Sequence, residues 1–325
     1  MTAYRRSGVD LEGADRHVTS IAPVVTATWN ERVVGGFGGF AAGVTLPTGY
    51  RDPVLMLTTD GVGTKLELAR RANRWEGVGF DLVAMVVDDL AAAGATPLGL
   101  VDYMAVGALA PQRDTAIVSS IARACSVAGC PLLGGETAEH PGVMAADQVD
   151  LAATALGVVE KGSELGSHRV VAGDVVIGLG SPNLRSNGFS LARTVIAGRD
   201  LDDQIEGRPV IDWLLEPSVI YSPAVLRAVG TGQVHAAAHI TGGGLMANLS
   251  RVIPTGCRAV VDFAAWQPPR IFRLLQEWGD LSGEDLHRVL NMGIGFCLIA
   301  ARDDAGSLID LCGHDALVIG EVAAL

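Results

Sequence analysis

The run Thr59-Asp60-Gly61-Val62-Gly63-Thr64-Lys65 places a carboxylate, two glycines and a lysine where a predicted strand (53–59) meets a predicted helix (64–73). Free amide groups at the start of a helix form a natural phosphate site. The run is not a P-loop, because the Gly-Lys-Ser/Thr sequence is absent. A carboxylate repels phosphate, so Asp60 is expected to bind a Mg²⁺ ion that bridges to phosphate. Lys65 is expected to supply a compensating positive charge.

Two further acidic segments suit the same metal. Asp88 and Asp89 are adjacent in an otherwise apolar predicted helix, 81–93, where buried charge is costly unless a cation or a donor meets it. Glu136 follows a glycine pair after a short predicted strand, 130–133. Ligands of open α/β sheets gather at strand ends. The pattern therefore predicts that Asp60, Asp89 and Glu136 converge, although each acid alone also suits a cap or a salt bridge.

Glycines 35–39 are the densest cluster in the chain. Residues 36–41 satisfy the G-x-G-x-x-A pattern of dinucleotide-binding folds, with Asp60 where a ribose-binding acid would be. The preceding residues, 30–34, are a poor central strand. We therefore set a dehydrogenase aside and predict a glycine-rich flap over a nucleotide, with Phe37 and Phe40 as its anchors.

These residues require elements that position them, and strand-like and helical segments alternate along the chain. Hydrophobic residues make up 49% of the chain and charged residues 18%, which is ample material for packed interiors. We predict two α/β or α+β domains, with a boundary in the polar segment 160–168. The predicted strands are 53–59, 99–106, 130–133, 151–159, 174–179, 296–300 and 316–322, and the predicted helices are 64–73, 81–93, 113–128, one from about Ser190, and 223–229.

The composition of the chain limits the partners that it is expected to bind. The formal charge is −12 and no basic stripe is present, so nucleic acid is not expected. The N-terminus has no apolar signal core, and no apolar run approaches the roughly 20 residues that span a bilayer. The five cysteines form no CxxC pair, which is typical of reduced thiols. We expect a cytoplasmic protein that is not bound to a membrane.

The order of these motifs along nearly the whole chain resembles the aminoimidazole ribonucleotide synthetase (phosphoribosylformylglycinamidine cyclo-ligase) family of purine biosynthesis. The segments that carry the resemblance are Ser7–Asp10, Gly35–Phe40, Asp60–Lys65, Asp81–Met85, Asp88–Pro97, Gly134–Glu139, Ser186–Leu191, His239–Gly244 and Asn291–Gly295. The resemblance implies a homodimer in which the N-terminal sheets form an inter-subunit β-barrel. It implies an ATP, Mg²⁺ and dimerisation domain over residues 1–165, and a C-terminal α+β domain on the substrate side over 166–325.

The implied reaction uses ATP to phosphorylate the formyl amide oxygen of formylglycinamidine ribonucleotide, after which a nitrogen attacks and closes the imidazole ring. The resemblance implies that Asp60, Asp89 and Glu136 bind Mg²⁺ and that Lys65 and His239 are catalytic. His239 is expected to act as a proton shuttle; the alternative is that His239 has only a structural role. The implied ATP contacts are Gly36, Gly38, Gly39, Asp60, Gly61, Gly63, Thr64, Lys65, Asp81, Gly135 and Thr137. The implied substrate contacts are Arg185, Ser186, Asn187, Gly188, Thr241, Gly242 and Gly243.

Three positions depart from the family pattern, all in the substrate half. Arg185, Val219 and Pro223 stand where the family usually has His, Arg and Lys. These departures favour a second hypothesis, a paralogue in specialised metabolism that acts as an ATP-dependent small-molecule kinase or cyclase. The intact motifs in both halves favour the cyclo-ligase itself. A nucleotide-sensing pseudoenzyme ranks last, because the three expected metal ligands are present.

Overall fold

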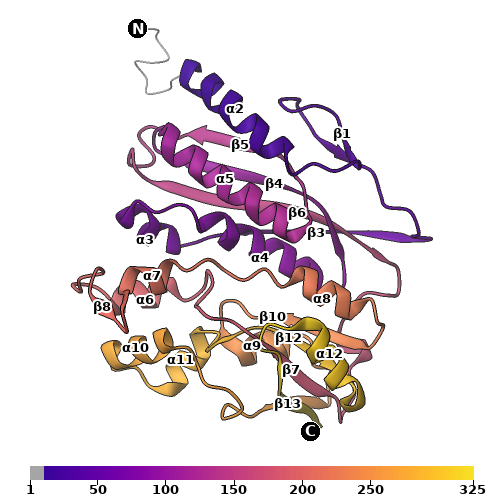
Figure 1. The fold of residues 1–325 in the computed structure, drawn as a ribbon. Coiled ribbons are helices and arrows are strands. Elements are labelled where there is room, and N and C mark those ends of the chain that lie inside the picture. The colour runs from indigo at the N-terminus through magenta and orange to yellow at the C-terminus, as the bar shows by residue number, and fades with distance from the viewer. Residues whose placement is uncertain (1–10) are drawn as a thin grey trace.

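The computed structural model describes residues 11–325, so the expected motif at Ser7–Asp10 lies outside the described residues. The described residues form two large sheets with their helices, one in each half of the sequence, stacked one above the other (Figure 1). The elements of the first half are α2 (Leu11–Thr26), β1 (Val33–Val34), β2 (Gly43–Val44), β3 (Pro53–Gly61), α3 (Lys65–Ala72), α4 (Val78–Ala92), β4 (Thr96–Val106), α5 (Pro111–Ala128), β5 (Leu132–Glu139) and β6 (Val149–Glu160).

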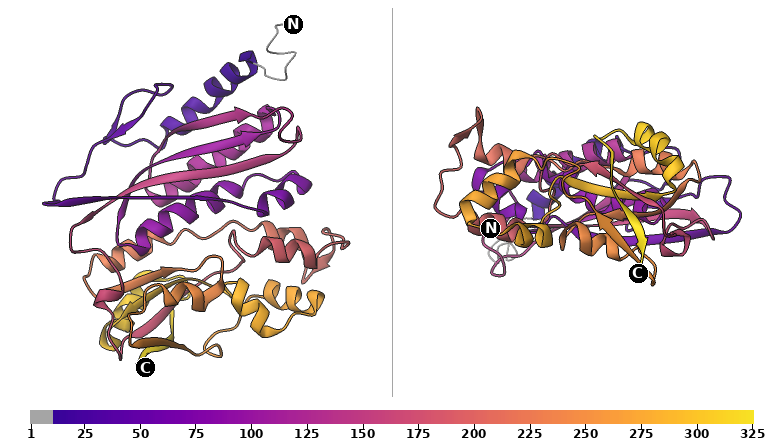
Figure 2. Two further views of the ribbon diagram at one scale, coloured as in Figure 1. Left: turned by 180° about the vertical axis from the view of Figure 1, so that it is seen from behind. Right: turned by 90° about the horizontal axis from the view of Figure 1, so that it is seen from below.

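The first sheet has the strand order β3-β6-β4-β5, with β4 and β5 parallel and the other pairs antiparallel. Helices α4 and α5 cover one face (Figure 1), and their apolar side chains, such as Leu82 and Ile117, are fully buried. No described helix lies over the opposite face, which faces the viewer in the left view of Figure 2. Leu55 and Leu57 of β3 are exposed there, which leaves an apolar surface without a partner in this chain.

The second half contains β7 (Val175–Gly180), α6 (Phe189–Val195), β8 (Gln204–Ile205), β9 (Arg208–Pro209), α7 (Val210–Leu215), α8 (Ser222–Val229), β10 (Val234–His239), α9 (Gly244–Ser250), β11 (Cys257–Val261), α10 (Arg270–Gly279), α11 (Gly283–Val289), β12 (Ile294–Ala300), α12 (Ala305–Cys312) and β13 (Leu317–Ala324). Its sheet is antiparallel, with the order β10-β12-β7-β13-β11. Side chains of α8 and α12 pack on one face of this sheet, and side chains of α9 pack on the other.

Helix α4 joins the two halves. Asp81, Met85 and Asp88 are spaced i, i+4 and i+7, so they share one face of the helix, and this face contacts the second half. Apolar side chains from both halves, including Leu66 and Leu215, belong to one continuous core cluster. The two halves are therefore packed together through a shared apolar core.

Most predicted elements are confirmed, and two predictions need correction. Strand β5 runs from Leu132 to Glu139, so the Gly134–Thr137 segment lies inside a strand and not after one. The 16-residue helix α2 is absent from the predicted elements. No helix within residues 11–325 is long and apolar enough to cross a bilayer.

The glycine-rich segment 35–42 is the loop of a small antiparallel hairpin formed by β1 and β2. No helix follows it, which agrees with setting the dinucleotide-binding motif aside. Gly35 and Gly38 have φ values of 101° and 84°, a conformation that side chains other than glycine rarely adopt. Phe37 packs against the core, whereas Phe40 is fully exposed. Of the two predicted anchors, only Phe37 packs against the hydrophobic core.

Candidate active site

Lys65 and Asp81 form a fully buried ion pair where the two halves meet. The Lys65 ammonium donates to Asp81 Oδ1 at 2.8 Å and to the carbonyl oxygens of Arg185 and Glu216 at 3.1 and 2.8 Å. Asp81 also accepts hydrogen bonds from the amide and the hydroxyl of Ser218. A lysine ammonium has three N–H donors, and all three have acceptors here. This placement does not support the expected contacts of Lys65 and Asp81 with a nucleotide, because their charges balance each other.

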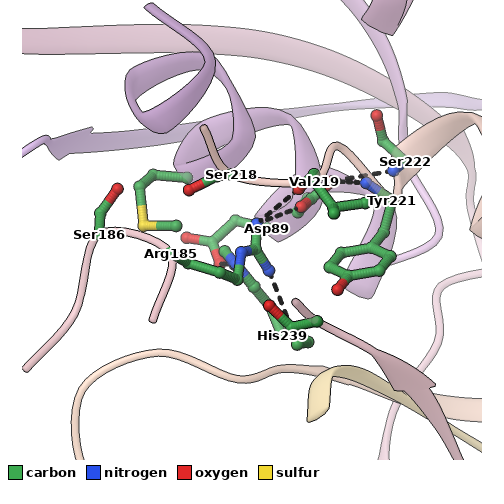
Figure 3. A network of polar contacts seen from close by, with 12 residues as sticks. Asp89, Arg185, Ser186, Ser218, Val219, Tyr221, Ser222 and His239 are labelled. Carbon is green, nitrogen blue, oxygen red and sulfur yellow. Dashed lines mark hydrogen bonds and ion pairs between the residues drawn. The ribbon is translucent and has the colours of Figure 1, made fainter. Parts of the chain in front are cut away.

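Arg185 meets the second acid of α4 in the same interface. Its guanidinium donates to Asp88 Oδ2 at 2.6 Å and to the carbonyl oxygens of Gly295 and Val219 at 2.9 and 3.2 Å. It lies over the ring of Tyr221, 4.9 Å from the ring centroid (Figure 3). Both charged side chains are fully buried. Arg185 was expected to contact substrate, but the structure places it inside the protein.

Asp89, the third acid of α4, is paired with His239 at the end of β10 (Figure 3). Asp89 Oδ1 lies 2.8 Å from His239 Nδ1, and Thr58 donates to Asp89 Oδ2 at 3.2 Å. Burial acts to raise the pKa of Asp89, but the hydrogen bonds from His239 and Thr58 outweigh it and the pKa is lowered. An ionised Asp89 can only accept, so Nδ1 carries the proton. The ring is thereby fixed in one tautomer.

The other ring nitrogen of His239, Nε2, is buried and has no hydrogen-bond partner in the described structure. The ring stacks on Phe296 at 6.0 Å between centroids, which fixes its plane. A buried polar atom without a partner is uncommon in folded proteins and requires an explanation. Histidine held by a carboxylate at one nitrogen, with the other nitrogen free, is the usual geometry of a general base or acid.

Asp60, at the end of β3, is electrostatically coupled to this pair. Burial raises the pKa of Asp60, and the nearby charge of Asp89 raises it further, while the Gly61 amide donates at 2.7 Å and opposes the shift. The repulsion between Asp60 and Asp89 is what a bound cation would relieve. These two carboxylates are the predicted metal ligands that the structure brings near each other.

Glu136 does not join them within one chain. Strands β6 and β4 lie between β3 and β5, so the outer strands are about 14 Å apart at the usual strand spacing. The register places Glu136 in the same row as Gly61, so Asp60 and Glu136 point to opposite faces of the sheet. Among residues 11–325, no cluster of three or more His, Cys, Asp or Glu has the arrangement of a metal site. The expected convergence of three acids is therefore corrected to a pair.

Glu136 lies instead in a cavity of about 660 Å³ between α2, the glycine-rich hairpin loop, and strands β4 and β5. Six of the expected ATP or metal contacts line it: Gly36, Gly38, Gly39, Gly135, Glu136 and Thr137. The other expected ATP contacts, Gly61, Gly63 and Thr64, follow Asp60 at the far end of the sheet, where Thr64 Oγ1 lies 3.2 Å from Ser190 Oγ. The structure thus divides the predicted nucleotide residues between two places.

Two residues of this cavity were missed by the sequence reasoning. Asp102 of β4 lies in the same row of the sheet as Asp60, two strands away, and burial raises the pKa of its carboxyl to about 7. A lone acid inside the apolar run Leu98–Val106 was the available signal. His17 lies on α2, which was not predicted, so nothing in the sequence reasoning drew attention to it.

The expected substrate loops lie side by side. A Cβ atom placed on Gly242 would be 3.6 Å from Asn187 Oδ1, so the 185–188 loop meets the 241–243 loop. Asn187 Nδ2 lies 3.7 Å from Met85 Sδ, and the Ser186 hydroxyl donates to the Asp81 carbonyl at 3.3 Å. Gly188 and Gly243, with φ of 77° and 94°, precede α6 and α9. Thr241 bonds to Asn248 within its own loop.

The fold and the site define a two-domain α/β protein with a carboxylate–histidine pair where the domains meet. Residues 41–159 match the family described as AIR synthase related protein, N-terminal domain, and residues 171–324 match the C-terminal domain of the same description. The chain belongs to the AIR synthase related family. The phosphoribosylformylglycinamidine cyclo-ligase of Synechococcus sp. (strain CC9605) is 44% identical over 329 residues, which cover 99% of this chain and 95% of that relative.

Solved structures share the fold at lower identity. Thiamine-monophosphate kinase from Stenotrophomonas maltophilia K279a superposes with a TM-score of 0.68 at 22% identity, over 94% of both chains. Hydrogenase maturation protein HypE in complex with ATP gives a TM-score of 0.71 at 18% identity, over 98% of this chain and 89% of that one. Both likenesses extend over both halves of the chain, so the two-domain architecture is common to all three proteins.

Proposed function

We propose that this chain is an ATP-dependent phosphoribosylformylglycinamidine cyclo-ligase, which forms aminoimidazole ribonucleotide in purine biosynthesis. The observation that carries the proposal is the 44% identity to a cyclo-ligase over 99% of the chain. The His239–Asp89 pair supports it, because ring closure requires a group that accepts a proton. The alternative, a kinase or cyclase acting on another substrate, is not favoured.

The reaction divides into two steps. The γ-phosphoryl group of ATP is transferred to the formyl amide oxygen, which makes that oxygen a good leaving group. A nitrogen of the substrate then attacks the same carbon, the C–O bond breaks, and phosphate leaves with its oxygen; the products are the imidazole, ADP and phosphate. The attacking nitrogen loses a proton, which His239 accepts at Nε2 while Asp89 stabilises the resulting imidazolium.

The carboxylates suit magnesium, which prefers oxygen ligands and binds through one or two carboxylates plus substrate phosphates. Asp60 and Asp89 would hold the ion, which would relieve the repulsion from Asp89 that helps to raise the pKa of Asp60. Bound Mg²⁺ would neutralise charge on the transferred phosphoryl group. Glu136 and the glycine-rich loop line the cavity that we assign to the rest of the nucleotide. Asn187 and Gly242, on adjacent loops, are the contacts we assign to substrate.

The three departures from the family pattern do not require another substrate. Arg185 lies in a buried ion pair and donates to the carbonyl of Val219, so it supplies a guanidinium next to the position where the usual arginine is missing. Pro223 lies in the first turn of helix α8, where proline is tolerated because its missing N–H would have no partner within the helix. Arg185 and the carbonyl of Val219 belong to the contact between the two halves. They support an altered interface between domains more than an altered substrate.

The proposal assigns nucleotide binding and dimerisation to residues 1–165, and substrate binding to residues 166–325, in a cytoplasmic enzyme. The uncovered face of the first sheet supports a homodimer. Leu57 and Leu55 are 72% and 54% exposed, and Val101 and Tyr103 of β4 are each 42% exposed. A contiguous apolar face of this kind usually marks an interaction site. A second copy packed sheet against sheet would bury it.

The function is tested by incubating the protein with ATP, Mg²⁺ and formylglycinamidine ribonucleotide, and measuring aminoimidazole ribonucleotide and ADP. We expect the two products in equal amounts, and no ADP when the ribonucleotide is omitted. Folded protein that binds ATP but forms no imidazole product would contradict the proposal. ADP formation with thiamine monophosphate in place of the ribonucleotide would support the kinase alternative.

The homodimer is tested with Leu57→Lys, which places a charge in the apolar face. Because a two-fold interface contains each substitution twice, we expect the dimer dissociation constant to rise at least about tenfold. Light scattering after size exclusion should give twice the chain mass of 33.7 kDa for the wild type, and a lower mass for the variant. Val143→Lys, at a site that is 81% exposed and outside the sheet, is the matched control and should remain dimeric. A monomeric wild type would refute the dimer.

A further inference from the structure

The cavity next to the glycine-rich loop has a lining that suits a base and not a phosphate. The residues that line it include no lysine or arginine, and they include the two carboxylates Asp102 and Glu136. A phosphate group deep in this cavity would therefore meet the carboxyl groups of Glu136 and Asp102 and no cation. Most of the remaining wall is apolar, with Ile21 and Phe37 among its residues. An apolar wall with a few fixed polar groups is typical of sites for flat organic rings.

One face of helix α2 forms part of this wall. His17, Ile21 and Val25 are spaced i, i+4 and i+8, so they lie above one another on the helix, and all three line the cavity. His17 is only 5% exposed. Its Nε2 lies 3.4 Å from the Thr137 hydroxyl on β5, which also lines the cavity. The position of the imidazole is thus fixed from two sides.

The second ring nitrogen of His17, Nδ1, is buried and has no hydrogen-bond partner in residues 11–325. Burial lowers the pKa of His17, although the nearby charge of Asp114 acts in the opposite direction. The ring is therefore held neutral, with one nitrogen as a donor and the other as an acceptor. A neutral ring with one unused nitrogen is suited to a polar, uncharged edge of a ligand and gives little attraction to phosphate.

We propose that His17 is a specificity-determining residue that contacts the edge of the purine base of the nucleotide through Nδ1, with Thr137 holding the ring in place. This inference rests on the proposed function, because that function supplies the nucleotide. At ring position 6, the amino group of adenine donates a hydrogen bond, whereas the carbonyl oxygen of guanine accepts one. In the tautomer in which Nε2–H donates to the Thr137 hydroxyl, Nδ1 is an acceptor, which pairs with the adenine amino group and not with guanine O6.

The test measures the affinity of the full-length protein for AMP-PNP and for GMP-PNP, each with Mg²⁺, by calorimetry. We expect His17→Leu to weaken AMP-PNP binding about fivefold, the effect of one neutral hydrogen bond, and to change GMP-PNP binding by less. His17→Asn places an amide close to the position of Nδ1 and should stay within about twofold of the wild type, whereas His17→Gln reaches toward Nε2 and should not. His168→Leu, an exposed histidine outside the cavity, is the matched control and should bind as the wild type does.

The outcomes separate the inference from the function on which it rests. If the wild type binds AMP-PNP and His17→Leu binds it equally well, the role of His17 is overturned and the proposed function stands. An equal loss for both nucleotides would place the contact on sugar or phosphate and overturn base reading. If the wild type binds no nucleotide, both proposals fail. Circular dichroism establishes that each variant is folded, and the Asn and Gln variants decide the question if Leu disturbs α2.

Discussion

We expect His239→Asn to lower kcat for imidazole formation by about 10²- to 10⁴-fold, the usual contribution of a positioned acid or base. The asparagine amide can still donate to Asp89, so the buried carboxylate keeps its partner while the Nε2 position is deleted. The affinity for Mg–AMP-PNP should stay within about threefold of the wild type, because the change removes no nucleotide contact. Steady-state kinetics and calorimetry on the same preparation measure both quantities.

His235 provides a matched control on the same strand. Its Nδ1 lies 2.8 Å from Asp174 Oδ2, the same arrangement that His239 has with Asp89, but at the other end of β10. His235→Asn should therefore leave kcat unchanged. If His239→Asn retains full kcat, or if both variants lose activity to the same extent, His239 holds the strand in place and takes no part in the chemistry.

The second large effect is expected on stability. Arg185→Met leaves Asp88 as a buried carboxylate without its cation, and breaking a buried pair in this way costs about 3–5 kcal/mol of unfolding free energy. The backbone amides of Tyr221 and Ser222 would still donate to Asp88. We therefore expect the loss of unfolding free energy to lie near the lower end of that range. Urea denaturation at one fixed protein concentration measures the change, because dimerisation would make stability depend on concentration.

A surface pair serves as the comparison. Arg302 and Glu321 are 2.8 Å apart but more than half exposed, so Arg302→Met should cost less than about 1 kcal/mol. The double variant Asp88→Leu/Arg185→Met should recover part of the loss, since removing both buried charges removes the unpaired one. If Arg185→Met is no more destabilising than Arg302→Met, the buried pair does not hold the domains together.

Local signals in the sequence accounted for much of the fold. The predicted helices 81–93 and 113–128 stop just before Gly94 and Gly129, and both glycines have the positive φ that is common at helix ends. Strands such as β3 and β6 were evident from their apolar runs. Helix α2 was missed although apolar residues recur at positions 14, 18, 21 and 25, because its glycine, proline and charged residues obscured that period. The glycine pair of β5 was placed outside its strand for a similar reason.

The contacts of the site were harder to predict than the fold, because the residues that form them lie far apart in the sequence. The sequence indicated that Asp88 and Asp89 needed a cation or a donor, but not that Arg185 and His239 provide them from 97 and 150 residues away. Lys65 follows Asp60 so closely that a shared ligand was the natural expectation. The helix that begins at Lys65 instead directs its side chain into the domain interface. Strand order, which separates Glu136 from Asp60, cannot be read from spacing along the chain.

The three acids of α4 also bear on how the enzyme can move. Asp81, Asp88 and Asp89 each bond to a different segment of the second half: Ser218, Arg185 and His239. A hinge that opened the two halves would have to expose or separate all three contacts at once, so the halves are not free to close on a ligand as a clamp does. If the nucleotide occupies the cavity to which we assign it, the exposed hairpin loop that carries Phe40 lies at its wall. We therefore expect ligand exchange to involve this loop and not a hinge between the two halves.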